Sequence, residues 1–264
     1  MTLPKVTAVR FDRRLGSGRT KPCIIFAETE EHEEVELVVK LAAGCELRGL
    51  VCEAFASLLA DDLDLPVPQA CLVEITDEFA RTVPDREVAA NIRKSCGFNF
   101  GSHKLSPQFS TWPVGRPIPL GLRPMAAEVL AFDGLLQNPD RRWNNPNCLV
   151  RGDELAIFDH DLAFSFLVGN IGGRQPWEPG GLDFLAANAD RHVFFDGLQG
   201  TPVNFDRLLG AFESIDRHRL SEYSNAIPQQ WRNGTDATGR IVAYIEQLKE
   251  HLAEAIAEVA RVLV

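Results

Sequence analysis

The first seventy-five residues alternate between apolar runs and charged or glycine-bearing turns. Runs rich in β-branched or other apolar residues cover 6–11, 23–27, 35–41 and 70–75, and such runs are typical of strands. Before the last run, residues 48–60 place apolar side chains at helical spacing, and a Leu-Pro-Val-Pro sequence ends this helix. This part of the chain therefore predicts strands around one helix.

The pattern changes in the rest of the chain. Residues 97–124 are rich in Gly, Pro and Ser and show little periodicity, which predicts connecting loops. A helix is expected over 125–136, directly after a proline whose missing N–H costs nothing at a helix start. Apolar residues on either side of a Gly-Asp turn predict a hairpin over 148–158. Helices are expected after Gly180, the last of them one amphipathic helix over 238–264.

These elements predict an α+β fold with two lobes that form one domain. Residues 1–100 would make an N-terminal lobe with a small antiparallel sheet and a helix, and residues 101–264 a mainly helical C-terminal lobe. The chain has 264 residues, of which 45% are hydrophobic and 24% charged, an ordinary globular composition that argues against disorder.

Charge and targeting signals narrow the classes of function. The net charge of −10 disfavours direct binding to nucleic acid. No segment approaches the roughly 20 apolar residues that cross a bilayer, and the N-terminus lacks the apolar core of a signal peptide, so the prediction is a cytoplasmic protein without a membrane anchor. The six cysteines are scattered, which favours reduced, buried thiols over disulfides or a metal site.

The strongest chemical pattern lies between Asn138 and Asp161. A loop aspartate, Asp140, precedes an Asn-rich stretch, a short hairpin and a second aspartate, Asp159. Phosphoryl transfer needs a carboxylate beside the attacking hydroxyl and at least two oxygen ligands that hold Mg²⁺ on the nucleotide phosphates. Asp and Asn are also common turn residues, but this order between apolar strands favours the chemical interpretation.

The N-terminal part adds candidate phosphate-binding groups. Lys40 is the one charge among the otherwise apolar residues 37–41, and Glu53 lies on the following helix, where its carboxylate could hold the lysine in place. The turn at Gly16, Ser17 and Gly18 could direct backbone N–H groups onto phosphate, although a single Gly-x-Gly is a weak signal. A second Asp-Arg-His sequence at 190–192 has no following Asn or Asp-bearing strand, so it is not predicted to be catalytic.

The motifs resemble a known family. The Asp-Arg pair at 140–141, the Asn-Pro-Asn-x-Leu sequence at 145–149 and the Asp-x-x-Leu-Ala-Phe sequence at 159–164 are similar to the HipA-like and phosphatidylinositol 3-/4-kinase-like branch of the protein-kinase-like superfold. The resemblance covers about residues 6–166 and implies a two-lobed kinase fold that uses ATP and magnesium. It also identifies Lys40 with the nucleotide-binding lysine and Glu53 with its partner.

The resemblance further implies roles in the C-terminal part. Asp140 would be the catalytic-loop aspartate, and Asp159 would be a metal ligand. The second metal ligand would be Asn147, because the Asn-x-Leu context matches the family. Asn145 stays an alternative, because many kinases place this amide five residues after the aspartate. Asp161 stands where the family has glycine and is a further alternative ligand.

The predicted function is transfer of the γ-phosphoryl group of ATP to a hydroxyl, with protein Ser or Thr as the first expected acceptor because HipA-like kinases act on proteins. Lipid and small metabolites remain as other acceptors. One alternative is a kinase-like module that binds nucleotide without turnover, and another is a regulatory component of a toxin–antitoxin-like pair with a protein partner.

Overall fold

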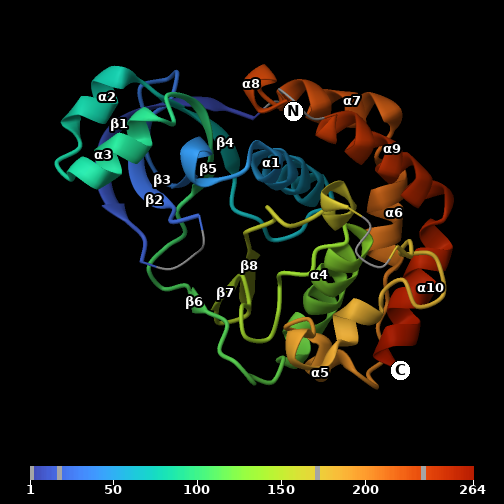
Figure 1. The fold of residues 1–264 in the computed structure, drawn as a ribbon. Helices are drawn as coiled ribbons and strands as arrows, with labels where there is room; N and C mark the ends of the chain where they lie inside the picture. Colours follow the sequence, from blue (N-terminus) through green and yellow to red (C-terminus); the bar gives the residue numbers. More distant parts are fainter. Residues whose placement is uncertain (1–2, 17–19, 170–172, 233–235) are drawn as a thin grey trace.

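The computed structural model describes residues 3–16, 20–169, 173–232 and 236–264. Its N-terminal part is a closed five-stranded barrel in which all neighbouring strands run antiparallel except β1 and β4 (Figure 1). In barrel order the strands are β1 (Lys5–Arg14), β2 (Cys23–Glu28), β3 (Glu34–Lys40), β5 (Gly97–His103) and β4 (Ala70–Ile75). The four predicted strands are confirmed, and the predicted small antiparallel sheet is a closed barrel in which one pair of strands, β1 and β4, is parallel.

The strand β5 contradicts the prediction of loops over 97–124. It pairs with β3 on one side and β4 on the other, and the predicted lobe boundary at residue 100 falls inside it. A Cβ on Gly101 would lie 2.5 Å from Cγ2 of Val73, so β5 needs glycine to approach its neighbour. Its glycines, which suggested a loop, are therefore a consequence of close packing.

The helix α1 (Leu47–Asp62) confirms the predicted helix and is buried along most of its length. It lies between the barrel and the C-terminal helices (Figure 1). A 3-10 turn, η1 (Ala42–Gly44), precedes it. The sequence analysis did not anticipate two short helices between β4 and β5, α2 (Asp77–Thr82) and α3 (Arg86–Arg93), which begin at side-chain caps from Thr76 and Asp85.

The remaining chain is mainly helical. The helix α4 (Arg123–Leu135) and the hairpin of β7 (Cys148–Arg151) and β8 (Glu154–Ile157) confirm their predictions, and β6 (Ser110–Thr111) pairs with β7. The helices that follow, shown in orange to red in Figure 1, are α5 (Phe195–Leu198), α6 (Asp206–Ser214), α7 (Arg217–Ala226), α8 (Gln229–Arg232), α9 (Ala237–Glu250) and α10 (Leu252–Leu263). Shorter 3-10 turns are η2 (Leu120–Leu122), η3 (Ser165–Val168), η4 (Asp183–Ala186) and η5 (Asn188–Asp190).

The predicted single helix over 238–264 is divided at His251. The backbone of His251 has φ −120° and ψ 24°, which separates α9 from α10. Its ring stacks on Trp177 with centroids 5.2 Å apart, so a tertiary contact accompanies the break. The apolar stripe predicted from the sequence is nevertheless buried, including Ile241, Leu248 and Val259.

Candidate functional site

Three predicted side chains from different elements meet at the end of β3. The ammonium group of Lys40 lies 2.6 Å from Oε2 of Glu53 on α1 and also contacts Oδ1 of Asp159, which follows β8. Lys40 and Glu53 are 7% and 2% exposed. The fold therefore joins the barrel, α1 and the segment after β8 through one buried ammonium group.

Burial and charge act in opposite directions on this cluster. Burial alone would lower the Lys40 pKa, but the neighbouring carboxylates outweigh it and hold that pKa above its ordinary value. Burial would likewise raise the Glu53 pKa, but Lys40 and His160 lower it to about 2. The backbone N–H of His160 also donates to Oε2 of Glu53 at 2.8 Å. Both partners are therefore charged at neutral pH.

The loop after α4 gathers the second group of predicted residues around Asp140. Oδ2 of Asp140 accepts from the side-chain amides of Asn145 and Asn147, each at 3.1 Å. Its Oδ1 accepts from Arg142 at 3.1 Å. The side chain of Asp140 is 14% exposed, so solvent reaches this carboxylate. Both candidate amides thus contact the same carboxylate, and this contact does not distinguish them.

The backbone connects Asn147 directly to the segment that carries Asp159. The carbonyl oxygen of Asn147 accepts from the N–H of Phe158 at 3.2 Å, which places Asn147 beside the residue before Asp159. Asn147 and Asp159 both adopt left-handed backbone conformations, with φ of 42° and 64°, and asparagine and aspartate tolerate this region better than most residues. Asp161 is buried against α1, 3.5 Å from where a Cβ on Gly49 would lie.

A buried polar network that the sequence analysis missed supports both groups. Arg141 is 1% exposed and donates to the carbonyl oxygens of Asn147 and Phe158, to His160 and to Asp133 of α4. His192, which the sequence analysis did not assign a role, lies 3.0 Å from Asp133. The sequence did contain one signal, since Asp133 and Glu128 are the two charged residues in the otherwise apolar stretch 125–136.

The charges in this network compensate one another. Burial would raise the Asp133 pKa, but Arg141 and His192 hold it well below its ordinary value. Burial lowers the pKa of His192, so its ring is neutral near pH 7. Arg141 therefore holds the Asp140 loop and the Asp159 segment next to each other through its bonds to Asn147 O and Phe158 O. Its charge is compensated by the buried ion pair with Asp133.

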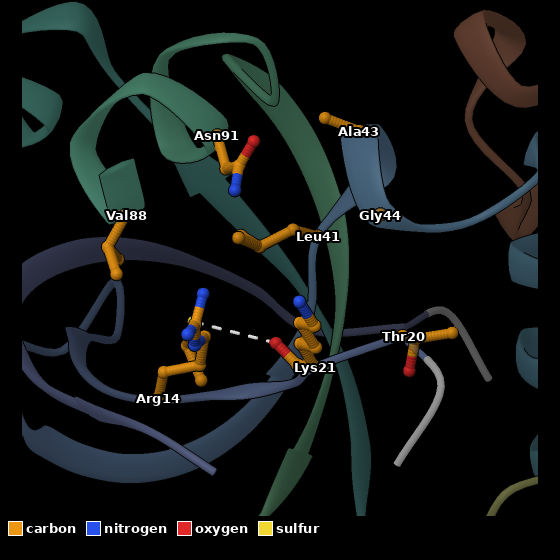
Figure 2. Close-up of a pocket in the computed structure, with 9 residues that line it drawn as sticks. Arg14, Thr20, Lys21, Leu41, Ala43, Gly44, Val88 and Asn91 are labelled. Carbon is orange, nitrogen blue, oxygen red and sulfur yellow. Dashed lines mark hydrogen bonds between the residues drawn. The ribbon is translucent and has the colours of Figure 1, made fainter. Parts of the chain in front are cut away.

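The glycine turn is only partly described. Gly16 has open space where a side chain would be, whereas Ser17 and Gly18 lie outside the described residues. A cavity of about 210 Å³ lies beside the ends of this turn, with Arg14, Lys21 and Asn91 around Leu41 (Figure 2). Leu41 belongs to the apolar cluster inside the barrel. The described lining of this cavity includes none of Lys40, Glu53 and Asp159, so the cavity is distinct from the Lys40 cluster.

The oxygen atoms near Asp140 and Asp159 suit a hard cation. Mg²⁺ is usually held by one or two protein carboxylate or amide oxygens together with substrate phosphates and water. The side chain of Asp159 is 27% exposed and pairs with Lys40. The carbonyl oxygen of Asn147 accepts a hydrogen bond from the N–H of Phe158, the residue before Asp159. Among the described residues, no group of three or more His, Cys, Asp or Glu side chains forms a metal site. In the same part of the chain, no helix combines the length and apolar character that crossing a bilayer requires.

Comparisons with known proteins give the family and the fold of the chain. A family model described as HipA-like kinase matches residues 8–169, so the chain belongs to the HipA-like kinase family. The fold is similar to the crystal structure of the Helicobacter pylori proinflammatory kinase CtkA, with a TM-score of 0.51 and 13% identity over 99% of each chain. A search of curated proteins gave no match. The family assignment confirms the resemblance seen in the sequence.

Proposed function

We propose that this chain is an ATP- and Mg²⁺-dependent phosphotransferase with a two-lobed kinase fold, and that its acceptor is a protein Ser or Thr hydroxyl. The barrel and α1, approximately residues 1–100, would form the nucleotide-binding lobe. Residues 101–264 would form the lobe that carries the Asp140 loop, the metal-binding segment and the acceptor site.

One observation carries the proposal. Lys40 contacts both Glu53 and Asp159, although Asp159 lies 119 residues further along the chain. A phosphate-binding lysine held by a helix carboxylate, next to a carboxylate that can bind a cation, is the arrangement that positions a nucleotide triphosphate. Family membership supports the same chemistry.

Each residue then has a defined task. Lys40 binds phosphate oxygens, and Glu53 keeps its ammonium group in place. Asn147 and Asp159 would hold Mg²⁺, with Asn145 and Asp161 as the alternative ligands. When Mg²⁺ is bound, it would neutralise the charge of the phosphate groups. Asp140 orients the acceptor hydroxyl and takes its proton.

Asp159 gives the direct test. Asp159→Asn keeps the size of the side chain but removes the carboxylate that would bind Mg²⁺. Calorimetry of ATP binding with and without Mg²⁺ should show strong metal dependence in the parent and little in the variant. Equal metal dependence in the two proteins would contradict the assignment. Asp161→Asn is the matched comparison, because it removes the neighbouring carboxylate of the same segment.

The contact of Lys40 with Asp159 also supports a second candidate, a module that binds nucleotide without turnover. In this structure the lysine engages the carboxylate that the metal would need. If ATP binds with Mg²⁺ but no acceptor is phosphorylated and no phosphate is released, this second function is the correct one.

A further inference from the structure

A second cavity lies beside the Asp140 loop, away from the Lys40 cluster. It has a volume of about 560 Å³, within the range of about 300–1,000 Å³ that small-molecule and cofactor sites occupy. All its described lining residues belong to the chain after α4. The side chains that matter for its chemistry are Gln137, Ser165, Phe166, Arg174, Gln175 and Phe184.

The backbone connects this cavity to the proposed chemistry. Pro139 lines the cavity and directly precedes Asp140. The segment that follows Asp159 runs along the end of α4, because the N–H of Phe164 donates to Leu136 O at 2.7 Å. A molecule in this cavity would therefore contact Pro139, the residue before Asp140, on a face whose described lining includes neither the barrel nor α1.

The cavity combines apolar, amide and cationic groups. Phe166 and Phe184 provide apolar surface, while Gln137 and Gln175 provide side-chain amides. Among the described lining residues, Arg174 is the one with an ionisable side chain. Its Nη1 donates to Pro179 O at 2.8 Å, and a guanidinium group has five N–H donors in all, so this bond fixes the side chain and leaves others for a ligand.

Two carboxylates in the same part of the chain as Arg174 have other partners. Asp183 pairs with Arg261, and Glu178 accepts from the backbone N–H of Gln175 at 2.7 Å. A single cation matches one carboxylate better than it matches a phosphate group, which carries about two charges and is usually held by several donors. Amide groups on the lining match the donors and acceptors of a peptide backbone.

We propose that this cavity binds a peptide acceptor that has an acidic residue near its Ser or Thr, and that Arg174 recognises this acidic side chain. The proposal rests on the phosphotransferase function proposed above. In the reaction, the hydroxyl oxygen forms a bond to the γ-phosphorus, and the bond from that phosphorus to the β,γ-bridging oxygen breaks. ADP leaves with that electron pair, and the hydroxyl proton passes to Asp140.

The test reverses the charge at residue 174 and measures phosphorylation of a library of Ser peptides. Each flanking position of these peptides is fixed in turn as Glu, Gln or Lys. The parent should prefer Glu at one position by on the order of tenfold, as expected for a charge-assisted contact at a partly exposed site. Arg174→Glu should prefer Lys there, and Arg174→Gln should show no preference while keeping a donor for Pro179. Arg217→Glu, which reverses an exposed charge paired with Glu246, should behave as the parent.

Several outcomes would overturn the proposal. One is an unchanged preference in Arg174→Glu when its melting temperature and ATP affinity match those of the parent. Another is a parent that hydrolyses ATP with Mg²⁺ but phosphorylates no peptide in the library, which leaves the phosphotransferase function standing. Failure of that function itself is recognised separately, because the parent would then not turn over ATP with Mg²⁺ at all, whether or not it binds the nucleotide.

Discussion

At the scale of single residues, Lys40 serves stability and ligand binding together. Lys40→Met removes the cation beside Glu53 and should cost about 3–5 kcal/mol, because breaking a buried pair leaves an uncompensated charge. Adding Glu53→Gln removes that charge and should restore most of the stability. ATP affinity should stay at least about tenfold weaker in both variants, because the phosphate partner is missing. Urea unfolding and calorimetry measure the two effects.

The matched control for this pair is Lys104→Met. Lys104 pairs with Glu36 in the barrel at 3.0 Å, but both side chains are partly exposed. We expect a cost below about 1 kcal/mol and unchanged ATP affinity. The assignment of Lys40 fails if the double variant binds ATP as well as the parent does.

Asp140 separates an enzyme from a binding module. Asp140→Asn should leave the affinity for ATP and Mg²⁺ within a few-fold of the parent and reduce phosphoryl transfer by ~10²-fold or more, because an amide cannot accept the proton. Asp190→Asn is the control, since Asp190 is the other carboxylate that pairs with Arg142. If Asp140→Asn keeps full turnover and loses only stability, Asp140 merely organises the loop.

The sequence could predict candidate residues where the chemistry requires certain residue types in a certain order along the chain. Lys40 directly follows the apolar residues 37–39, and Asp140 and Asp159 bracket a hairpin, so residue type and order selected all three as candidates. The sequence context favoured Asn147 over Asn145, and the structure does not test this choice, because both amides donate to Asp140. Ligand choice depends on side-chain orientation, which spacing alone does not determine.

At the scale of elements, the Asp140 loop depends on α4 through Arg141. Arg141→Met would leave Asp133 buried beside a neutral His192 and should cost about 3–5 kcal/mol. Adding Asp133→Asn should recover much of that loss. Arg219→Met removes a less buried pair with Asp62 and should cost less. Urea midpoints of the three variants and the parent test this, and equal costs for the two arginines would contradict it.

Element prediction failed where tertiary pairing outweighed local pattern. The residues of β5 have weak intrinsic strand preference, and the strand forms because β3 and β4 both pair with it. The break at His251 has a similar origin, since local periodicity continues through it while a ring contact with Trp177 accompanies the turn. By contrast, α1 and the hairpin of β7 and β8 have local patterns that agree with their environment, and both were predicted.

At the scale of the whole molecule, the C-terminal helices hold the barrel and α1 together. Arg207 of α6 donates to Glu128 of α4 and to the carbonyl oxygen of Leu63 at the end of α1. Trp231 and Gln230 of α8 both donate to the carbonyl oxygen of Phe98 in β5, at 3.0 and 2.7 Å. The similarity of fold to CtkA over 99% of each chain at 13% identity indicates that the fold as a whole tolerates extensive sequence change.

The contact of α8 with β5 should matter for the site as well as for stability, because β5 pairs Phe100 with Lys40. Trp231→Phe keeps the ring but removes one donor, and Gln230→Ala removes the other. Each alone should cost about 1–2 kcal/mol, because the Phe98 carbonyl keeps one partner. Together they leave it unsatisfied, so the double variant should lose at least about 0.5 kcal/mol more than the sum of the single losses.

Urea unfolding of the parent, the two single variants and the double variant closes this cycle, and ATP affinity should fall furthest in the double variant. Gln229→Ala is the control, because Gln229 is an exposed neighbour in the same helix. Combined with Trp231→Phe, it should give additive losses and leave ATP affinity at the level of Trp231→Phe alone. Additivity in the Gln230 cycle would mean that the two donors act independently on β5, and the proposed coupling of α8 to Lys40 would then be wrong.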